Sequence, residues 1–179
     1  MQTQILYTIG HSNRSIDDFR ELLKLNEVEI LVDVRAQPVS SQFPHFNQPE
    51  LRDFMEEVDI TYHWAGRQLG GMRAVQDNSP HIALTDEHMR GYADYMSSRD
   101  FERAASQLIN LTHHATGALL SAEQDPALCH RSLIADYLVL QGVTVMHILD
   151  SEIREHHLRS EARKESAALI YNHGVVPPA

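Results

Sequence analysis

The chain has 179 residues, a formal net charge of −10, 42% hydrophobic residues and 22% charged residues. This composition is typical of an ordinary globular protein, and the length predicts a single domain over residues 1–179 with one substantial core. The excess of acidic residues argues against non-specific binding to duplex nucleic acid, which depends on Lys and Arg, and no apolar run approaches the roughly 20 residues that span a bilayer.

Cysteine usage and the start of the chain bear on the compartment. One cysteine excludes an intramolecular disulfide framework and fits a reducing environment. The first residues lack the basic and then apolar pattern of a signal peptide. We therefore expect a soluble, cytoplasmic protein without membrane contact.

Short apolar runs alternate with amphipathic segments along the chain. The predicted elements are, in order, strand 5–9, helix 15–25, strand 29–34, helix 48–58, strand 60–64, helices 86–97 and 100–114, strand 117–120, a helix ended by Gly142, strand 143–148, and a polar last helix capped by Ser151. Residues 66–84 have no apolar period and predict a long loop, which is usually a binding lid or disordered. Residues 172–179 predict a loosely ordered tail. The alternation predicts an α/β sandwich with a largely parallel sheet flanked by helices.

Unusual polar residues fall where the predicted strands end. Because ligands of open α/β sheets bind outside the carboxyl ends of the strands, we expect a single pocket there. Its expected lining is His11, Asp33, Arg35, Glu123, Cys129 and Arg131, with Ser12 and Asn13 beside His11. Each residue also has a structural interpretation, such as a helix cap at Ser12 or an ion pair between Asp33 and Arg35.

Cys129 is followed directly by His130 and Arg131. If a helix begins near His130, its amides and the adjacent cations favour the thiolate, and the pKa of Cys129 lies below the usual value of about 8.5. If the helix begins at Asp125 and Pro126 instead, Cys129 lies one turn inside it and is a small buried apolar residue. The sequence leaves both alternatives open.

Common cofactor and phosphate motifs are missing. The position six after Cys129 is Ala135, not the Arg of a cysteine phosphatase loop, and neither a P-loop nor a Gly-x-Gly-x-x-Gly motif occurs. A zinc site would need Cys129, His130 and His11 from separate loops. We therefore expect no cofactor and no tightly held metal.

Several motifs together resemble the family of domain of unknown function 488. They are Thr8–Ser12, Leu31–Arg35, Pro44–Asn47, Gly91–Met96 and Glu123 with Cys129–Arg131, in a match from Ile5 to His157. The resemblance implies a Rossmann-like three-layer α/β domain and no particular reaction. Family members often carry Cys-Ala-Glu where this chain has Ser121-Ala-Glu123, so we expect either a mechanism with one thiol or a site that has drifted from the family chemistry.

Three functions compete. The first is a thiol-dependent enzyme acting on a small anionic or nucleotide-like substrate. In it Cys129 is the nucleophile, His130, His11 or Glu123 moves protons, Arg35 and Arg131 bind the anion, and Asp33, Ser12 and Asn13 complete the substrate site. The second is a non-catalytic module that binds a nucleotide, a nucleic-acid end or a peptide, although the net charge does not support nucleic acid. The third is a metal-dependent hydrolase.

Overall fold

The computed structural model describes residues 3–150, 152–166 and 168–172, and its main feature is a six-stranded sheet. The strand order is β3-β2-β4-β1-β5-β6. The first five strands are parallel, and β6 is antiparallel to β5. The strands are β1 (Ile5–Gly10), β2 (Ile30–Asp33), β3 (Thr61–Trp64), β4 (Gly117–Ser121), β5 (Thr144–Ile148) and β6 (Ile153–Glu155).

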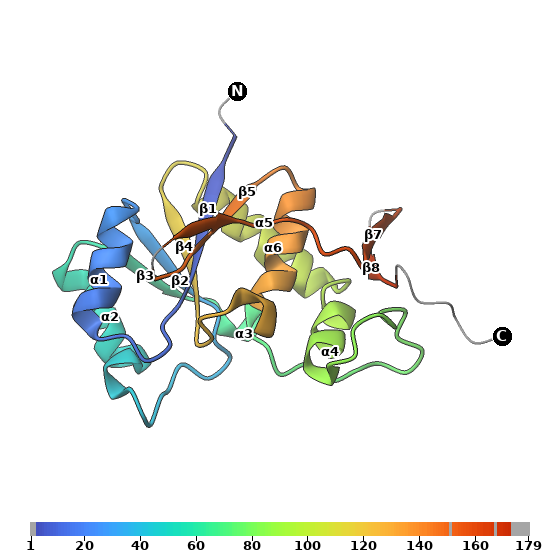
Figure 1. Cartoon of the computed structure of the whole chain (residues 1–179), viewed down its shortest axis with the longest axis horizontal. Coiled ribbons are helices and arrows are strands. Elements are labelled where there is room, and N and C mark those ends of the chain that lie inside the picture. The colour runs from blue at the N-terminus through green and yellow to red at the C-terminus, as the bar shows by residue number, and fades with distance from the viewer. Residues whose placement is uncertain (1–2, 151, 167, 173–179) are drawn as a thin grey trace.

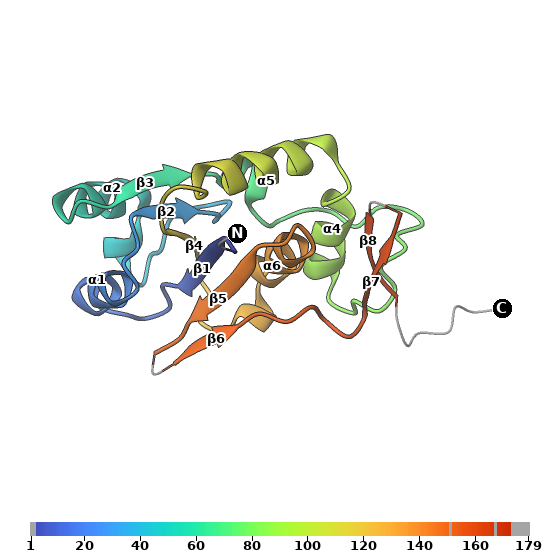
Figure 2. The ribbon, with the colours of Figure 1, turned by 90° about the horizontal axis from the view of Figure 1, so that it is seen from above.

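Helices cover both faces of this sheet. They are α1 (Ile16–Leu25), α2 (Gln48–Glu57), α3 (Gly66–Leu69), α4 (Glu87–Tyr95), α5 (Arg99–Leu111) and α6 (Arg131–Leu140), with short 3-10 turns η1 (Pro44–Phe46) and η2 (Pro126–Leu128). Figures 1 and 2 show α1 and α2 on one side of the sheet and α5 and α6 on the other. The predicted α/β fold with a largely parallel sheet between two helical layers is confirmed.

Each helical layer has its own apolar core. Phe19 of α1 and Leu51 of α2 pack with Leu120 of β4 on one face. Phe101 of α5 and Leu133 of α6 pack on the other face with residues such as Leu119 of β4. Successive residues of β4 therefore point into opposite cores, as expected for a central strand that is buried on both sides.

The connections that follow two neighbouring parallel strands, β1 and β4, leave towards opposite faces of the sheet. The two strands pair with Gly10 opposite Ser121. From β1 the chain continues to α1 on one face, whereas from β4 it continues to α6 on the other. A Cβ atom at position 10 would lie 1.8 Å from the carbonyl oxygen of Glu123, so only glycine allows this close approach. This divergence creates the kind of crevice in which α/β proteins bind ligands.

The prediction of a last helix after Ser151 is wrong. Ser151 lies outside the described residues, and beyond it the chain forms β6 and then a hairpin of β7 (Ala162–Glu165) and β8 (Ala168–Tyr171). The segment is rich in Glu, Arg and Ala, which favour helices, but strand pairing with β5 overrides this weak preference. From residue 173 on, the predicted loose tail also lies outside the described residues.

Candidate active site

A cavity of about 510 Å³ lies at the carboxyl ends of β1, β2 and β4. Of the residues predicted for this site, five line the cavity: His11, Arg35, Glu123, Cys129 and His130. The register explains why they meet, because Gly10, Asp33 and Ser121 end three neighbouring strands at the same level. The volume is within the range of cavities that hold small ligands.

Cys129 lies between two helical segments. The carboxylate of Asp125 accepts a hydrogen bond from the amide of Ala127 and caps η2, which ends before Cys129. The longer helix α6 begins only at Arg131. Both predicted helix starts therefore occur, and the thiol lies at the N-terminus of α6 rather than one turn inside it.

Cys129 and His130 form a polar pair on the cavity wall. The Cys129 Sγ atom lies 3.6 Å from His130 Nδ1, and His130 Nε2 lies 3.2 Å from the carbonyl oxygen of Val34. A carbonyl oxygen only accepts, so Nε2 donates to it, and in the neutral ring Nδ1 accepts from the thiol. The ring is held in place by Tyr92, whose ring centroid lies 4.8 Å from that of His130.

The surroundings of the sulfur lower the pKa of the thiol. Burial is the largest influence and raises the pKa of Cys129, but hydrogen bonding to His130 and the nearby charges of His130 and Arg131 lower it, and the net value is about 7. The backbone amide of Arg131 also donates to Sγ across 3.4 Å. These features favour a thiolate at neutral pH, in agreement with the predicted direction.

His11 contributes a neutral ring to the cavity. Its ring stacks on Phe46, with centroids 4.6 Å apart, and its Nδ1 lies 2.9 Å from the carbonyl oxygen of Ser12. Burial lowers the pKa of His11 to about 4, and the positive charge of Arg35 acts in the same direction. At neutral pH its Nδ1 donates to Ser12, which leaves Nε2 as a hydrogen-bond acceptor rather than an acid.

Arg35 lines the cavity but is paired. Its Nε and one terminal nitrogen donate to the two carboxylate oxygens of Asp33, at 2.9 and 2.7 Å, and the other terminal nitrogen donates to the carbonyl of Phe46 at 2.8 Å. Asp33 is fully buried beneath it and also accepts from Tyr62 at 2.6 Å. These contacts use three of the five N–H groups of Arg35 and leave two for other acceptors.

Arg131 was expected to line the cavity, but it is not among the lining residues. Its side chain is fully buried and donates to the Ser121 hydroxyl and to the carbonyls of Glu123 and Gln124. Arg131 is thus enclosed and Arg35 is paired with Asp33, and the anion clamp of these two residues stays a prediction. Glu123 is exposed on the cavity wall.

Ser12 and Asn13 lie outside the cavity lining. Ser12 has a positive φ of 47°, and this turn directs the chain from β1 towards α1. The Ser15 hydroxyl, rather than that of Ser12, caps α1 by accepting from the amide of Asp18. The structure thus places Ser12 and Asn13 in the turn that orients His11.

The sequence interpretation missed a group of residues that complete the cavity. They are Gln37, Val39, Gly71, Met72, Asp86, His88 and Leu128. Gly71 and Met72 belong to the predicted loop 66–84, which begins with the helix α3. The motif Gly91–Met96 secures this loop, since Asp94 accepts from the amide of Gln76 at 2.9 Å and Tyr92 donates to the carbonyl of Leu69 at 2.8 Å. The sequence feature that could have indicated Gly71 and Met72 is the unusual length of the predicted loop.

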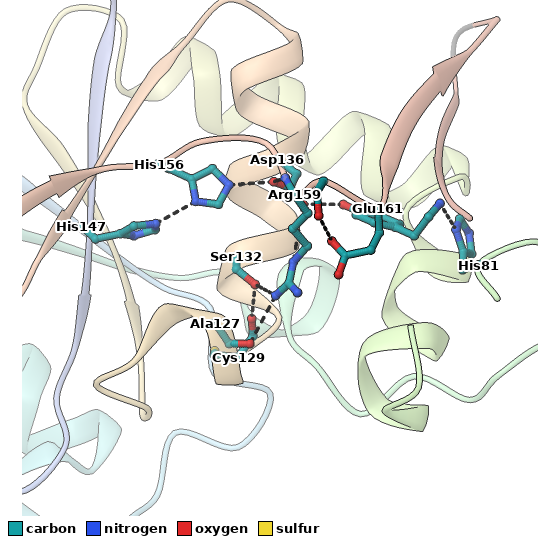
Figure 3. A network of polar contacts seen from close by, with 11 residues as sticks. His81, Ala127, Cys129, Ser132, Asp136, His147, His156, Arg159 and Glu161 are labelled. Atoms are coloured by element: carbon teal, nitrogen blue, oxygen red, sulfur yellow. Dashed lines mark hydrogen bonds and ion pairs between the residues drawn. The ribbon is translucent and has the colours of Figure 1, made fainter. Parts of the chain in front are cut away.

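A second polar cluster, the Asp136 network, is centred further along α6 (Figure 3). Asp136 is fully buried and accepts from His156 Nε2 at 2.7 Å and from the Tyr171 hydroxyl at 2.8 Å. His156 Nδ1 in turn lies 2.9 Å from Nε2 of His147. Arg159 donates to the Ser132 hydroxyl at 2.7 Å and thereby reaches the turn that carries Cys129 (Figure 3).

A metal site and a membrane-spanning helix are both absent from the part of the chain that the structure describes. Within residues 3–150, 152–166 and 168–172, no three His, Cys, Asp or Glu side chains are grouped so that they could hold a metal ion. Among the helices of these same residues, none has the length and apolar character needed to cross a membrane.

Comparison with known proteins gives a family but no activity. The family model described as domain of unknown function DUF488 matches residues 15–138, which include Cys129 and most of the cavity. No curated protein and no solved structure matches the chain. The predicted resemblance is confirmed, and the function has to be argued from the site itself.

Proposed function

The chain belongs to the DUF488 family, whose description assigns no activity, and we propose that it is a thiol-dependent enzyme in which Cys129 is the nucleophile and His130 moves the proton. The observation that carries this proposal is the ordered contact from Cys129 Sγ through His130 to the carbonyl of Val34. A thiol, a base in contact with it and a third group that orients the base are the parts that nucleophilic catalysis requires.

The proposed reaction has two steps. In the first, the thiol proton moves to His130 Nδ1, the thiolate forms a bond to an electrophilic carbon of the substrate, and the leaving group departs with the proton of the His130 imidazolium. In the second, water bonds to the same carbon and the carbon–sulfur bond breaks, while His130 takes a proton from the water and returns one to the sulfur. The Val34 carbonyl stabilises the imidazolium, because both ring nitrogens then carry protons.

His11 and Arg35 line the same cavity and support this chemistry. The neutral His11 ring accepts a hydrogen bond from the substrate, since burial keeps its pKa at about 4. The two remaining N–H groups of Arg35 donate to an oxygen on which negative charge develops.

Alkylation by iodoacetamide tests the proposal, because Cys129 is the only cysteine and intact mass therefore reports one site. We expect the rate on the native protein to rise with a midpoint near the Cys129 pKa of about 7. In the variant His130→Gln the midpoint moves upward, and the rate at neutral pH falls by roughly tenfold or more. His88→Gln is the matched control, because His88 lines the same cavity without a hydrogen bond to the sulfur.

A thiol that stays inert in the native protein and reacts only after unfolding would overturn the proposal. The same holds if the two histidine variants have the same midpoint. Either result would favour a non-catalytic binding module.

A further inference from the structure

Three large apolar side chains are strongly exposed around the cavity that contains Cys129. Val39 is 72% exposed, Met72 is 70% exposed and Leu128 is 72% exposed, and all three line this cavity. They come from three separate segments, namely the loop after β2, the loop after α3, and η2. Single exposed apolar residues are common on proteins, but three that converge on one cavity indicate a surface that is covered when a ligand binds. We call these three residues the apolar rim.

The charges of the cavity are unfavourable for a strongly anionic ligand. Among the described residues that line it, Arg35 is the only Lys or Arg, and Asp33 neutralises it. Two carboxylates, Asp86 and Glu123, lie on the lining. The cavity therefore combines a reactive thiol, a paired guanidinium and an apolar rim, and it has no free guanidinium to attract an anion.

From this combination we propose that the substrate is an uncharged acyl compound, an ester or thioester, whose apolar acyl chain packs against Val39, Met72 and Leu128. This inference rests on the proposed function and specifies its substrate class. Cys129 Sγ bonds to the carbonyl carbon, the ester or thioester bond breaks, and the alcohol or thiol leaves with the proton from His130. Water then releases the carboxylic acid and regenerates the thiol. The remaining N–H groups of Arg35 donate to the carbonyl oxygen as it becomes negative.

The test compares 4-nitrophenyl acetate with 4-nitrophenyl hexanoate, each corrected for its reactivity with a small free thiol and for the background of a Cys129→Ala variant. We expect the native protein to react with the hexanoate about tenfold faster than with the acetate, roughly what burial of two of its four additional methylene groups provides. Mass spectrometry should find the acyl group on Cys129. The triple variant Val39→Ser, Met72→Ser and Leu128→Ser should lose this preference.

A matched control is Leu25→Ser, because Leu25 is 77% exposed at the end of α1 and does not line the cavity. This variant should keep the preference for the hexanoate. The inference is overturned if the native protein shows no preference, if the preference survives in the triple variant, or if the anionic ester 4-nitrophenyl hemisuccinate reacts fastest.

The iodoacetamide profile separates this inference from the proposed function. If that profile keeps its midpoint near neutrality while the chain-length preference is absent, the thiol enzyme stands and the acyl substrate does not. If the alkylation profile has no midpoint near neutrality, both the proposed thiol enzyme and the acyl substrate are overturned.

Discussion

Two polar clusters involve α6: Cys129 and His130 at its N-terminus, and the Asp136 network further along it. They differ in how completely their hydrogen-bonding groups are used. In the Asp136 network, both oxygens of Asp136 accept from side chains of the segment after β5, and no part of Asp136 is exposed. In the cluster of Cys129 and His130, the sulfur and the imidazole lie on the wall of a cavity. A closed network stabilises one conformation, whereas an open pair can exchange a proton with a ligand.

The largest expected effect is on stability. Asp136→Ala removes the carboxylate that accepts hydrogen bonds from the side chains of His156 and Tyr171 and from the backbone amide of Arg159. These donors then lose their acceptor in the protein interior. We expect the free energy of unfolding to fall by about 3–5 kcal/mol, measured by urea denaturation. Asp53→Ala removes an exposed ion pair with Arg52 and should cost less than about 0.5 kcal/mol. If His130→Gln destabilised the protein as much as Asp136→Ala, the contrast between the two clusters would be wrong.

The next effect is the dependence of stability on pH. Burial lowers the pKa of His147 to about 3 and that of His11 to about 4, so both stay neutral in the folded protein while the unfolded chain takes up protons below about pH 6.5. The unfolded state therefore binds more protons, and stability falls as the pH is lowered. Between pH 6.5 and 5 we expect a loss of about 2 kcal/mol for each histidine, seen as a lower urea midpoint. His147→Gln should flatten this profile, and an unchanged slope would contradict the assignment.

A smaller effect is expected where Arg131 meets Ser121. Ser121→Ala removes an acceptor from a fully buried guanidinium and should lower the free energy of unfolding by about 1–2 kcal/mol. It should also raise the pKa of Cys129, because the hydrogen bond with Ser121 lowers it. Urea denaturation and the pH profile of alkylation measure the two effects, with the exposed Ser160→Ala as control. A thiol profile that does not move would show that Ser121 supports only Arg131.

The smallest expected effect is on the thiol when the Asp136 network is changed. His156 contacts Asp136 and His147 but not the sulfur. In His156→Asn the stability should fall, while the alkylation midpoint of Cys129 stays within about 0.3 pH units of the wild-type value, because the hydrogen bonds of His156 go to Asp136 and His147 and screening weakens distant charges. A larger shift would mean that the clusters are coupled through α6.

The sequence predicted the fold better than the site. The predicted strands 29–34 and 117–120 each contain a short apolar run, and the structure places β2 and β4 there, because burial on both faces leaves a clear pattern. The last helix was wrong because β6 is fixed by pairing with β5, a contact that local composition does not contain. Whether residues 1–179 form a single domain stays a prediction.

At the site, position along the strands placed His11, Arg35, Glu123 and Cys129 around one cavity. It could not indicate that Arg131 points inward to Ser121, because a guanidinium beside a thiol is compatible with both orientations. Met72 was missed because a loop without periodicity gives no register from which to place a side chain. His88 lies in the first turn of α4, and the helix pattern does not indicate that this turn reaches the cavity. Asp136 was hidden within α6, where its role depends on partners that lie 20 or more residues further along the chain.

The position of Asp136 has a practical consequence for choosing fragments of this protein. The family match ends at residue 138, so it includes Asp136 but excludes His156, Arg159 and Tyr171. A recombinant fragment cut at that boundary would keep a carboxylate in the interior and discard the side chains that hold it there. Fragments for expression, crystallisation or screening should therefore extend at least to Tyr171, whose backbone also pairs with Ala83 of the loop beside the cavity.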